Sequence, residues 1–169
     1  MSLVETIIIV LLAVLILLMI WLITEFNNMR AAIKERTGIN NETIKIRLQA
    51  YERLSLLTER ISLQTLISRF GNNSQSARDL KHNVIDAIKQ EYDYNISQQV
   101  YVSPDAWRAV SNLKEQNIYI VNQLAATLPM QATGIDLSKH IIDYMMNNQK
   151  ANLSTVVAEV LSFEAKKVM

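Results

Sequence analysis

The stretch EYDYNISQQVYVSPDAWRAV, residues 91–110, decides how the rest of the chain is interpreted. Ser103, Pro104 and Asp105 form a strong helix start, because serine caps a helix, proline fits its first turn and aspartate meets the positive end of its dipole. Before them, apolar residues recur at helical spacing up to Tyr92 and Ile96. We therefore predict a helix end, a tight corner and a helix start.

The aromatic and amide side chains of this stretch have two interpretations. Tyr92 and Trp107 fall on the apolar stripes of the two helices, and the amides can satisfy backbone groups that a helix end leaves free. This favours a packed corner. The alternative is a partner-binding patch, because aromatic residues are favoured at protein interfaces. The candidate partner-binding residues are Tyr94, Gln98, Gln99, Tyr101 and Trp107.

The rest of the chain is poor in turn-forming residues. Three glycines and two prolines in 169 residues do not suit the many tight turns of a β fold. Apolar stripes at helical spacing predict helices over residues 42–61, 63–70, 77–100, 104–128, 137–148 and 153–168. We predict an all-α chain with one N-terminal transmembrane helix followed by a small bundle of about five or six helices.

Several helix ends are predicted from single residues. Gly38 is expected to end the first helix, and Asn40 or Asn41 to cap the next. Ser62 is expected to cap the helix over residues 63–70, which Gly71 stops, and Asp136 to cap the helix that begins at residue 137. In the helix over residues 42–61 the core-facing stripe is expected to be Ile46, Ala50, Tyr51, Leu54, Leu57 and Ile61.

Residues 7–23 read IIIVLLAVLILLMIWLI, an uninterrupted apolar block. About 20 such residues cross a bilayer core of about 30 Å as a helix. A cleavable signal peptide is disfavoured, because no lysine or arginine precedes the block and no small-x-small cleavage site follows it. We expect a retained anchor, with Trp21, Phe26, Arg30 and Lys34 at the membrane interface.

Charge predicts the orientation of the anchor. Glu5 and the terminal amine precede the block, whereas Arg30, Lys34 and Arg36 follow it. Because positive charge stays in the cytoplasm, the N-terminus is expected on the outer side of the membrane and the C-terminal part in the cytoplasm. Residues 1–36 then form the anchor and juxtamembrane helix, and residues 37–169 a soluble helical domain. The alternative is that the domain is exported.

Composition and motifs restrict the chemistry. A net charge of +1 argues against nucleic-acid binding, and the lack of cysteine excludes disulfides and thiolate chemistry. His140 lies between Asp136 and Asp143 at helical spacing, but a helix cap and a local ion pair explain this arrangement better than a metal site does. His82 has a similar setting. We expect no metal, no cofactor and no catalytic residues.

Two runs, LQAYERLSLLTERI (residues 48–61) and YNISQQVYVSPDAWRAV (residues 94–110), carry a resemblance to a known family. They resemble an uncharacterised family of small single-span helical membrane proteins from Bacteroidota, a domain of unknown function. The resemblance covers most of the chain. It implies a bacterial inner-membrane protein and no particular activity or cofactor.

Two kinds of function follow from these patterns. The first is a membrane-anchored interaction or scaffold module that binds a protein partner, or a second copy of itself, and has no catalytic activity. The second is a membrane-tethered enzyme or small-ligand binder with Glu52, Glu59, His82 or His140 in a pocket. The first is favoured, because no catalytic motif is present. A buried cluster of these four side chains would favour the second.

Overall fold

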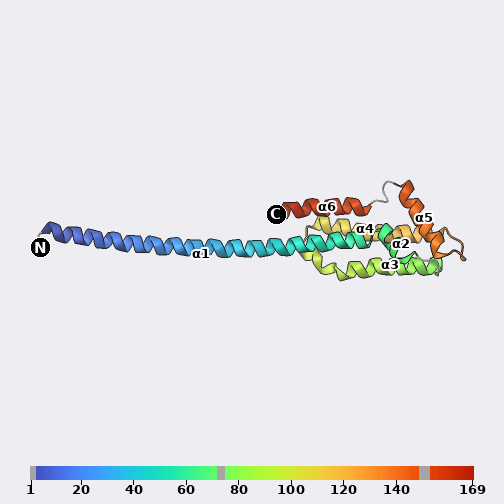
Figure 1. Ribbon diagram of the computed structural model, residues 1–169, viewed down its shortest axis with the longest axis horizontal. Coiled ribbons are helices and arrows are strands. Elements are labelled where there is room, and N and C mark those ends of the chain that lie inside the picture. Colours follow the sequence, from blue (N-terminus) through green and yellow to red (C-terminus); the bar gives the residue numbers. More distant parts are fainter. Residues whose placement is uncertain (1–2, 72–74, 149–152) are drawn as a thin grey trace. The chain divides into compact units, whose positions relative to one another are not determined.

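The computed structural model describes residues 3–71, 75–148 and 153–169. Every regular element among them is helical, as Figure 1 shows, and only an isolated bridge between Ser76 and Thr133 has β geometry. The elements are α1 (Leu3–Arg60), α2 (Leu63–Phe70), α3 (Ala77–Tyr94), the 3-10 helix η1 (Ile96–Val100), α4 (Pro104–Ala126), α5 (Gly134–Asn147) and α6 (Leu153–Val168). The prediction of an all-α chain is confirmed.

The chain divides into two compact units, Met1–Thr43 and Ile44–Met169. The first unit consists of the N-terminal part of α1. The second contains the end of α1 together with the five other α-helices and η1. Each unit is described by itself below.

The prediction that Gly38 ends the first helix, and that Asn40 or Asn41 caps the next, is wrong. α1 is one helix from Leu3 to Arg60. A glycine inside a helix costs about 1 kcal/mol relative to alanine, which helical neighbours on both sides can offset. The hydroxyl of Thr37 also donates a hydrogen bond to the carbonyl of Ile33, one turn earlier, at 2.8 Å.

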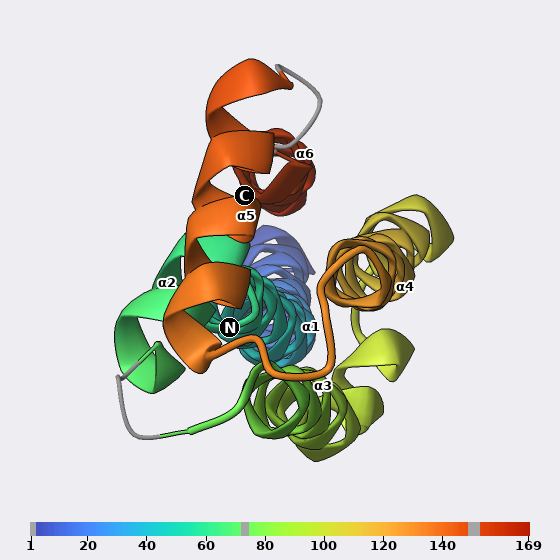
Figure 2. The same ribbon diagram turned by 90° about the vertical axis from the view of Figure 1, so that its right-hand side faces the viewer.

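The end of α1 contributes to the core of the second unit. In the end-on view of Figure 2 the other helices lie around it. The stripe predicted for this segment is confirmed at Ala50, Tyr51, Leu54, Leu57 and Ile61, which are all buried. Ile46 is the exception. Its side chain is 44% exposed, because the core cluster begins one turn later, at Ala50.

The predicted bounds of α2 are confirmed, with Ser62 as N-cap and Gly71 as C-cap. α3 is shorter than predicted, because it ends at Tyr94 and not at residue 100. The side chain of Asn95 donates to the carbonyl of Glu91 at 2.8 Å, and so replaces the backbone donor that would continue the helix. The chain then tightens into η1, and Ile96 is exposed instead of continuing the core stripe.

The start of α4 is confirmed, since Ser103 accepts a hydrogen bond from the backbone of Ala106 and Pro104 opens the helix. The predicted cap of α5 is wrong by one turn. Thr133 is the N-cap, and Asp136 is the third helical residue, whose carboxylate accepts the backbone N–H of Thr133 at 2.9 Å. This reciprocal pair is a capping box, which uses both residues. The predicted bounds of α6 are confirmed.

Candidate functional site

The corner between α3 and α4 is held by aromatic packing. The rings of Tyr92 and Trp107 lie 5.1 Å apart between centroids, inclined by 34°. The Tyr92 hydroxyl lies 2.9 Å from the hydroxyl of Ser111, within hydrogen-bonding distance. The ammonium group of Lys114 lies 4.3 Å from the centre of the Tyr92 ring, a cation–π contact. These contacts fix the end of α3 against the start of α4.

The last part of α1 is also hydrogen-bonded to this corner. The buried Tyr51 side chain accepts, at its hydroxyl, the backbone N–H of Ser103 at 3.1 Å. The guanidinium group of Arg47 donates to the carbonyl of Tyr101 at 3.3 Å. Three helices therefore hold η1 and the residue that follows it in one position.

This rigid corner presents apolar side chains to solvent. Tyr94 and Val100 are 74% and 76% exposed, and Ile96 and Tyr101 are also exposed. We call these four residues the apolar corner. Among the other candidate partner-binding residues, Gln99 is exposed, whereas Gln98 and Trp107 are half-buried. The predicted residues thus lie in one region, but Trp107 serves the packing of the corner.

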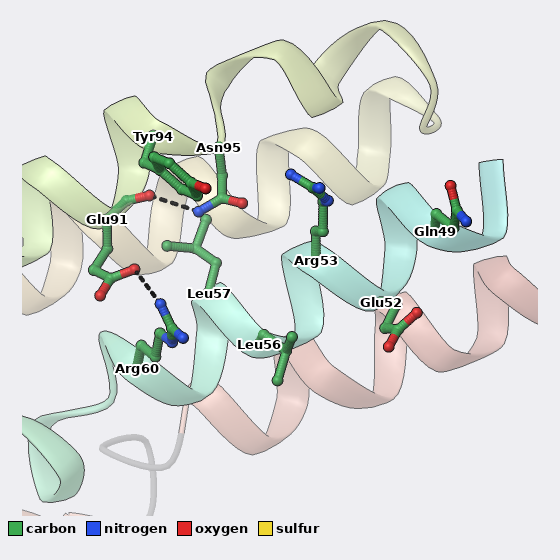
Figure 3. A pocket seen from close by; sticks show the side chains of 9 residues that line it. All are labelled: Gln49, Glu52, Arg53, Leu56, Leu57, Arg60, Glu91, Tyr94 and Asn95. Carbon is green, nitrogen blue, oxygen red and sulfur yellow. Dashed lines mark hydrogen bonds and ion pairs between the residues drawn. The ribbon is translucent and has the colours of Figure 1, made fainter. Parts of the chain in front are cut away.

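A hollow of about 440 Å³ lies beside the apolar corner, between the last part of α1 and the end of α3 (Figure 3). Tyr94 belongs to both features. The hollow is lined by Gln49, Glu52, Arg53, Leu56, Leu57, Arg60, Glu91, Tyr94 and Asn95.

The charges in the hollow are balanced. Arg60 pairs with Glu91 at 3.3 Å, and Arg69, just outside, lies 4.0 Å from the other Glu91 oxygen. Arg53 forms no ion pair with any side chain in the part of the chain that the structure describes, and in Figure 3 it points toward the side of Tyr94 and Asn95. A wall with paired and unpaired polar groups around Leu56 suits the rim of a protein interface.

No sequence pattern predicted this hollow. One hint was present in the sequence: Leu56 is apolar and lies off the core stripe of its helix, and it is exposed in the structure. The position of Glu91 opposite Arg60 depends on how α3 packs beside α1, and no local pattern predicts it.

The four residues of the enzyme hypothesis are not brought together. Glu52 lines the hollow. Glu59 accepts a hydrogen bond from the hydroxyl of Thr65 at 3.1 Å. His82, on α3, lies 3.2 Å from Asp86, and His140 is exposed on α5. Within residues 3–71, 75–148 and 153–169, no three histidine, aspartate or glutamate side chains are grouped to hold a metal ion.

The carboxylate beside His140 has a structural role. The backbone N–H and the hydroxyl of Thr133 hydrogen-bond to Asp136 and hold the pKa of its carboxyl group below the ordinary value of 3.8. Lys139 and His140 lower this pKa further, by weaker charge interactions. Asp136 is therefore explained by the start of α5.

The first unit presents a second unusual surface, the apolar side chains of α1. From Leu11 to Ile23 the described apolar side chains are 50% to 66% exposed. The guanidinium group of Arg30 lies 4.8 Å from the centre of the Phe26 ring, and Lys34 is exposed. Among the described residues, α1 is the one helix long and apolar enough to cross a membrane, and none of its most apolar window is buried.

These features define a class: an all-α protein with a long, exposed apolar helix and a small helical bundle that carries an apolar corner. The chain belongs to a family of unknown function, DUF7935, whose sequence pattern matches residues 1–168. The expectation of an uncharacterised family is confirmed. No curated protein and no solved structure was found to match the chain.

Proposed function

We propose that this protein is a membrane-anchored helical interaction module without catalytic activity of its own. One observation carries the proposal: the described apolar side chains between Leu11 and Ile23 are each at least half exposed, on all sides of the helix. A core helix of a soluble protein buries such side chains, and water does not favour exposing them. A bilayer surrounds a helix on all sides and so keeps these apolar side chains away from water.

The anchor is a single pass through the inner membrane of a bacterium, with the N-terminus outside and the helical bundle in the cytoplasm. Arg30, Lys34 and Arg36 follow the apolar run and support this orientation. The resemblance to small single-span proteins of Bacteroidota supports the same compartment.

The apolar corner and the neighbouring hollow form the partner-binding surface. A protein interface typically has an apolar centre with aromatic residues and a polar rim. Tyr94, Val100 and Tyr101 supply such a centre, and Arg53 and Glu52 supply part of the rim. Since three helices hold this corner in place, binding requires little ordering of the chain.

The test is to purify the tagged full-length protein from its own membranes after mild crosslinking and to identify co-purifying proteins by mass spectrometry. We expect one stoichiometric partner. The double variant Tyr94→Ser/Val100→Ser should lower its yield about tenfold or more, as loss of central apolar contacts does. Tyr119→Ser is the matched control, because Tyr119 is also exposed but lies on α4, away from the corner.

Two outcomes would contradict the proposal. If the corner variant and the control recover the partner in equal yield, the apolar corner is not the binding surface. Recovery of the chain without any other protein would contradict the proposal that it binds a different protein. The orientation is tested separately, with a C-terminal reporter that is active only outside the cytoplasm: we expect no activity.

A further inference from the structure

The part of α1 that follows the apolar run carries a narrow apolar stripe. Phe26, Met29 and Ile33 are 53%, 54% and 64% exposed. With Met19 and Leu22 they keep the alternating spacing of three and four residues that places side chains along one face of a helix. We call Met19, Leu22, Phe26, Met29 and Ile33 the α1 seam.

A membrane surface does not cover the far end of the α1 seam. The apolar run ends at Ile23, and only Thr24 separates it from Glu25, so the run must be used in full to cross the bilayer. A helix rises about 1.5 Å per residue, which puts Ile33 about 15 Å beyond Ile23 and outside the headgroup layer of about 5–8 Å. A helix that turned to lie on the membrane would need a break, and α1 is continuous over this segment.

We propose that the α1 seams of two copies of this chain pack against each other as a short parallel coiled coil next to the membrane. The proposal rests on the proposed membrane anchor, because two copies inserted with the same topology bring their helices together in parallel. In the seven-residue repeat of a coiled coil, Phe26 and Ile33 take the a positions and Leu22 and Met29 the d positions. The next d position is Arg36, where the apolar seam ends.

The surface of α1 already has the shape that this packing needs. A hollow of about 380 Å³ is lined by Met19, Leu22, Ile23, Glu25, Phe26 and Met29. In a parallel coiled coil a side chain at a enters a hole formed by four residues of the facing helix: the preceding d and g, the same a, and the following d. Here these four are Leu22, Glu25, Phe26 and Met29, and all four line the hollow. It accepts Phe26 of the second copy.

Charges beside the seam match the same arrangement. Glu25 takes a g position and Arg30 the e position five residues later. In a parallel pair, g of one helix faces this e of the other, so Glu25 of each copy meets Arg30 of its partner copy. Arg30 lies beside the seam in the structure, with its guanidinium group 4.8 Å from the centre of the Phe26 ring.

The chain offers a direct test, because it contains no cysteine. Single cysteines are placed in the full-length protein at seam positions (Phe26→Cys, Met29→Cys, Ile33→Cys) and outside the seam (Asn27→Cys, Asn28→Cys, Ala31→Cys). Isolated membranes are oxidised, and disulfide-linked dimer is measured on non-reducing gels. A disulfide needs Cα atoms about 4.4–6.8 Å apart, so we expect seam positions to give about tenfold more dimer than the others.

Charge reversal tests the pairing of Glu25 with Arg30 independently. In the Met29→Cys chain, Glu25→Arg alone should lower the dimer yield about threefold to tenfold, because it places two positive charges opposite each other. Adding Arg30→Glu to the same chain restores the opposite-charge pair and should restore the yield. No recovery in the double variant would overturn the assignment of g and e positions.

The remaining outcomes separate this inference from the proposed anchor. Equal dimer yield at all six positions, no dimer at any position, or a disulfide from the seam to a different protein in place of the dimer would each overturn the coiled coil. The same membranes are washed with alkaline carbonate. Retention of the chain together with a missing seam pattern overturns only the coiled coil, whereas release of the chain overturns the anchor.

Discussion

Asn117 is a buried polar side chain on α4 that completes the end of α1. Its amide nitrogen donates to the carbonyl of Ile61 at 2.8 Å. The last carbonyls of a helix have no partner within the helix, and a buried one must find a donor elsewhere. One side chain on α4 thus holds the residue that follows α1, 56 positions earlier in the sequence.

Replacing this amide should cost stability. Asn117→Leu keeps much of the volume but leaves the Ile61 carbonyl buried without a donor. We expect the free energy of unfolding to fall by about 1–3 kcal/mol. The measurement is urea unfolding of the full chain in detergent, followed by circular dichroism.

The matched control is Asn122→Leu, an exposed asparagine on the same helix, for which we expect a change within about 0.5 kcal/mol. Equal effects at the two positions would show that the hydrogen bond from Asn117 is unimportant.

Asp136 gives a prediction that depends on pH. Hydrogen bonds from Thr133 lower the pKa of its carboxyl group in the folded chain. Such a group stabilises the fold above its unfolded pKa of 3.8, and this stabilisation is lost as the pH falls through the lower, folded pKa. We expect Asp136→Asn to lower the melting temperature at neutral pH, and the deficit to shrink as the pH falls below 3.8. Melting curves of both chains across this range test it.

Asp143→Asn serves as the control, because the Asp143 carboxylate accepts no hydrogen bond from the described residues of the same unit. At neutral pH, Asp143→Asn should lower the melting temperature less than Asp136→Asn does. A deficit of Asp136→Asn that stays constant down to the lowest pH would contradict the role of the charged carboxylate.

At the scale of single helices, two glycines have opposite roles. A Cβ atom added at Gly71 would lie 2.6 Å from the carbonyl oxygen of Ile67 and 2.8 Å from the hydroxyl of Ser138, so the backbone of α2 would have to shift. A Cβ at Gly38 would meet no atom within 4 Å.

We therefore expect opposite signs from the same substitution. Gly71→Ala should destabilise the chain by about 1–3 kcal/mol through overpacking. Gly38→Ala should favour the helical state of α1 locally by about 0.5–1 kcal/mol. Thermal unfolding measures the loss of stability in Gly71→Ala, and circular dichroism measures the change in helix content in Gly38→Ala. A loss of helix content in Gly38→Ala would argue against a continuous α1.

Helix starts could be predicted where a capping residue precedes an apolar stripe, as at Ser62 and Ser103. Ends and corners were less predictable. α3 stops at Tyr94 because the Asn95 side chain competes for a backbone carbonyl, although the apolar spacing continues to Ile96. The hollow beside the apolar corner was not predictable at all, because it depends on two helices meeting more than 30 residues apart, at Arg60 and Glu91.

At the scale of the molecule, the division into two units has a physical basis in the distribution of the core. Among the described residues, the buried apolar cluster begins at Ala50 and extends to Leu161, all within the second unit. The exposed apolar side chains described between Leu11 and Ile23 belong to the first unit and are not part of that cluster.

A chain that begins at Ile44 should therefore fold without the first unit. We expect a helical spectrum, one cooperative thermal transition and recovery in the soluble fraction, whereas the full chain stays with the membranes.

A chain that begins at Ser55 is the control, since it lacks Ala50, Tyr51 and Leu54 from the core. Losing a buried leucine to alanine alone costs about 2–5 kcal/mol, a large part of the stability of a small domain, so the shorter chain should not fold. An unfolded Ile44 chain would mean that the bundle needs α1 beyond its own core, and an Ile44 chain that still pellets with membranes would place membrane binding outside the apolar run.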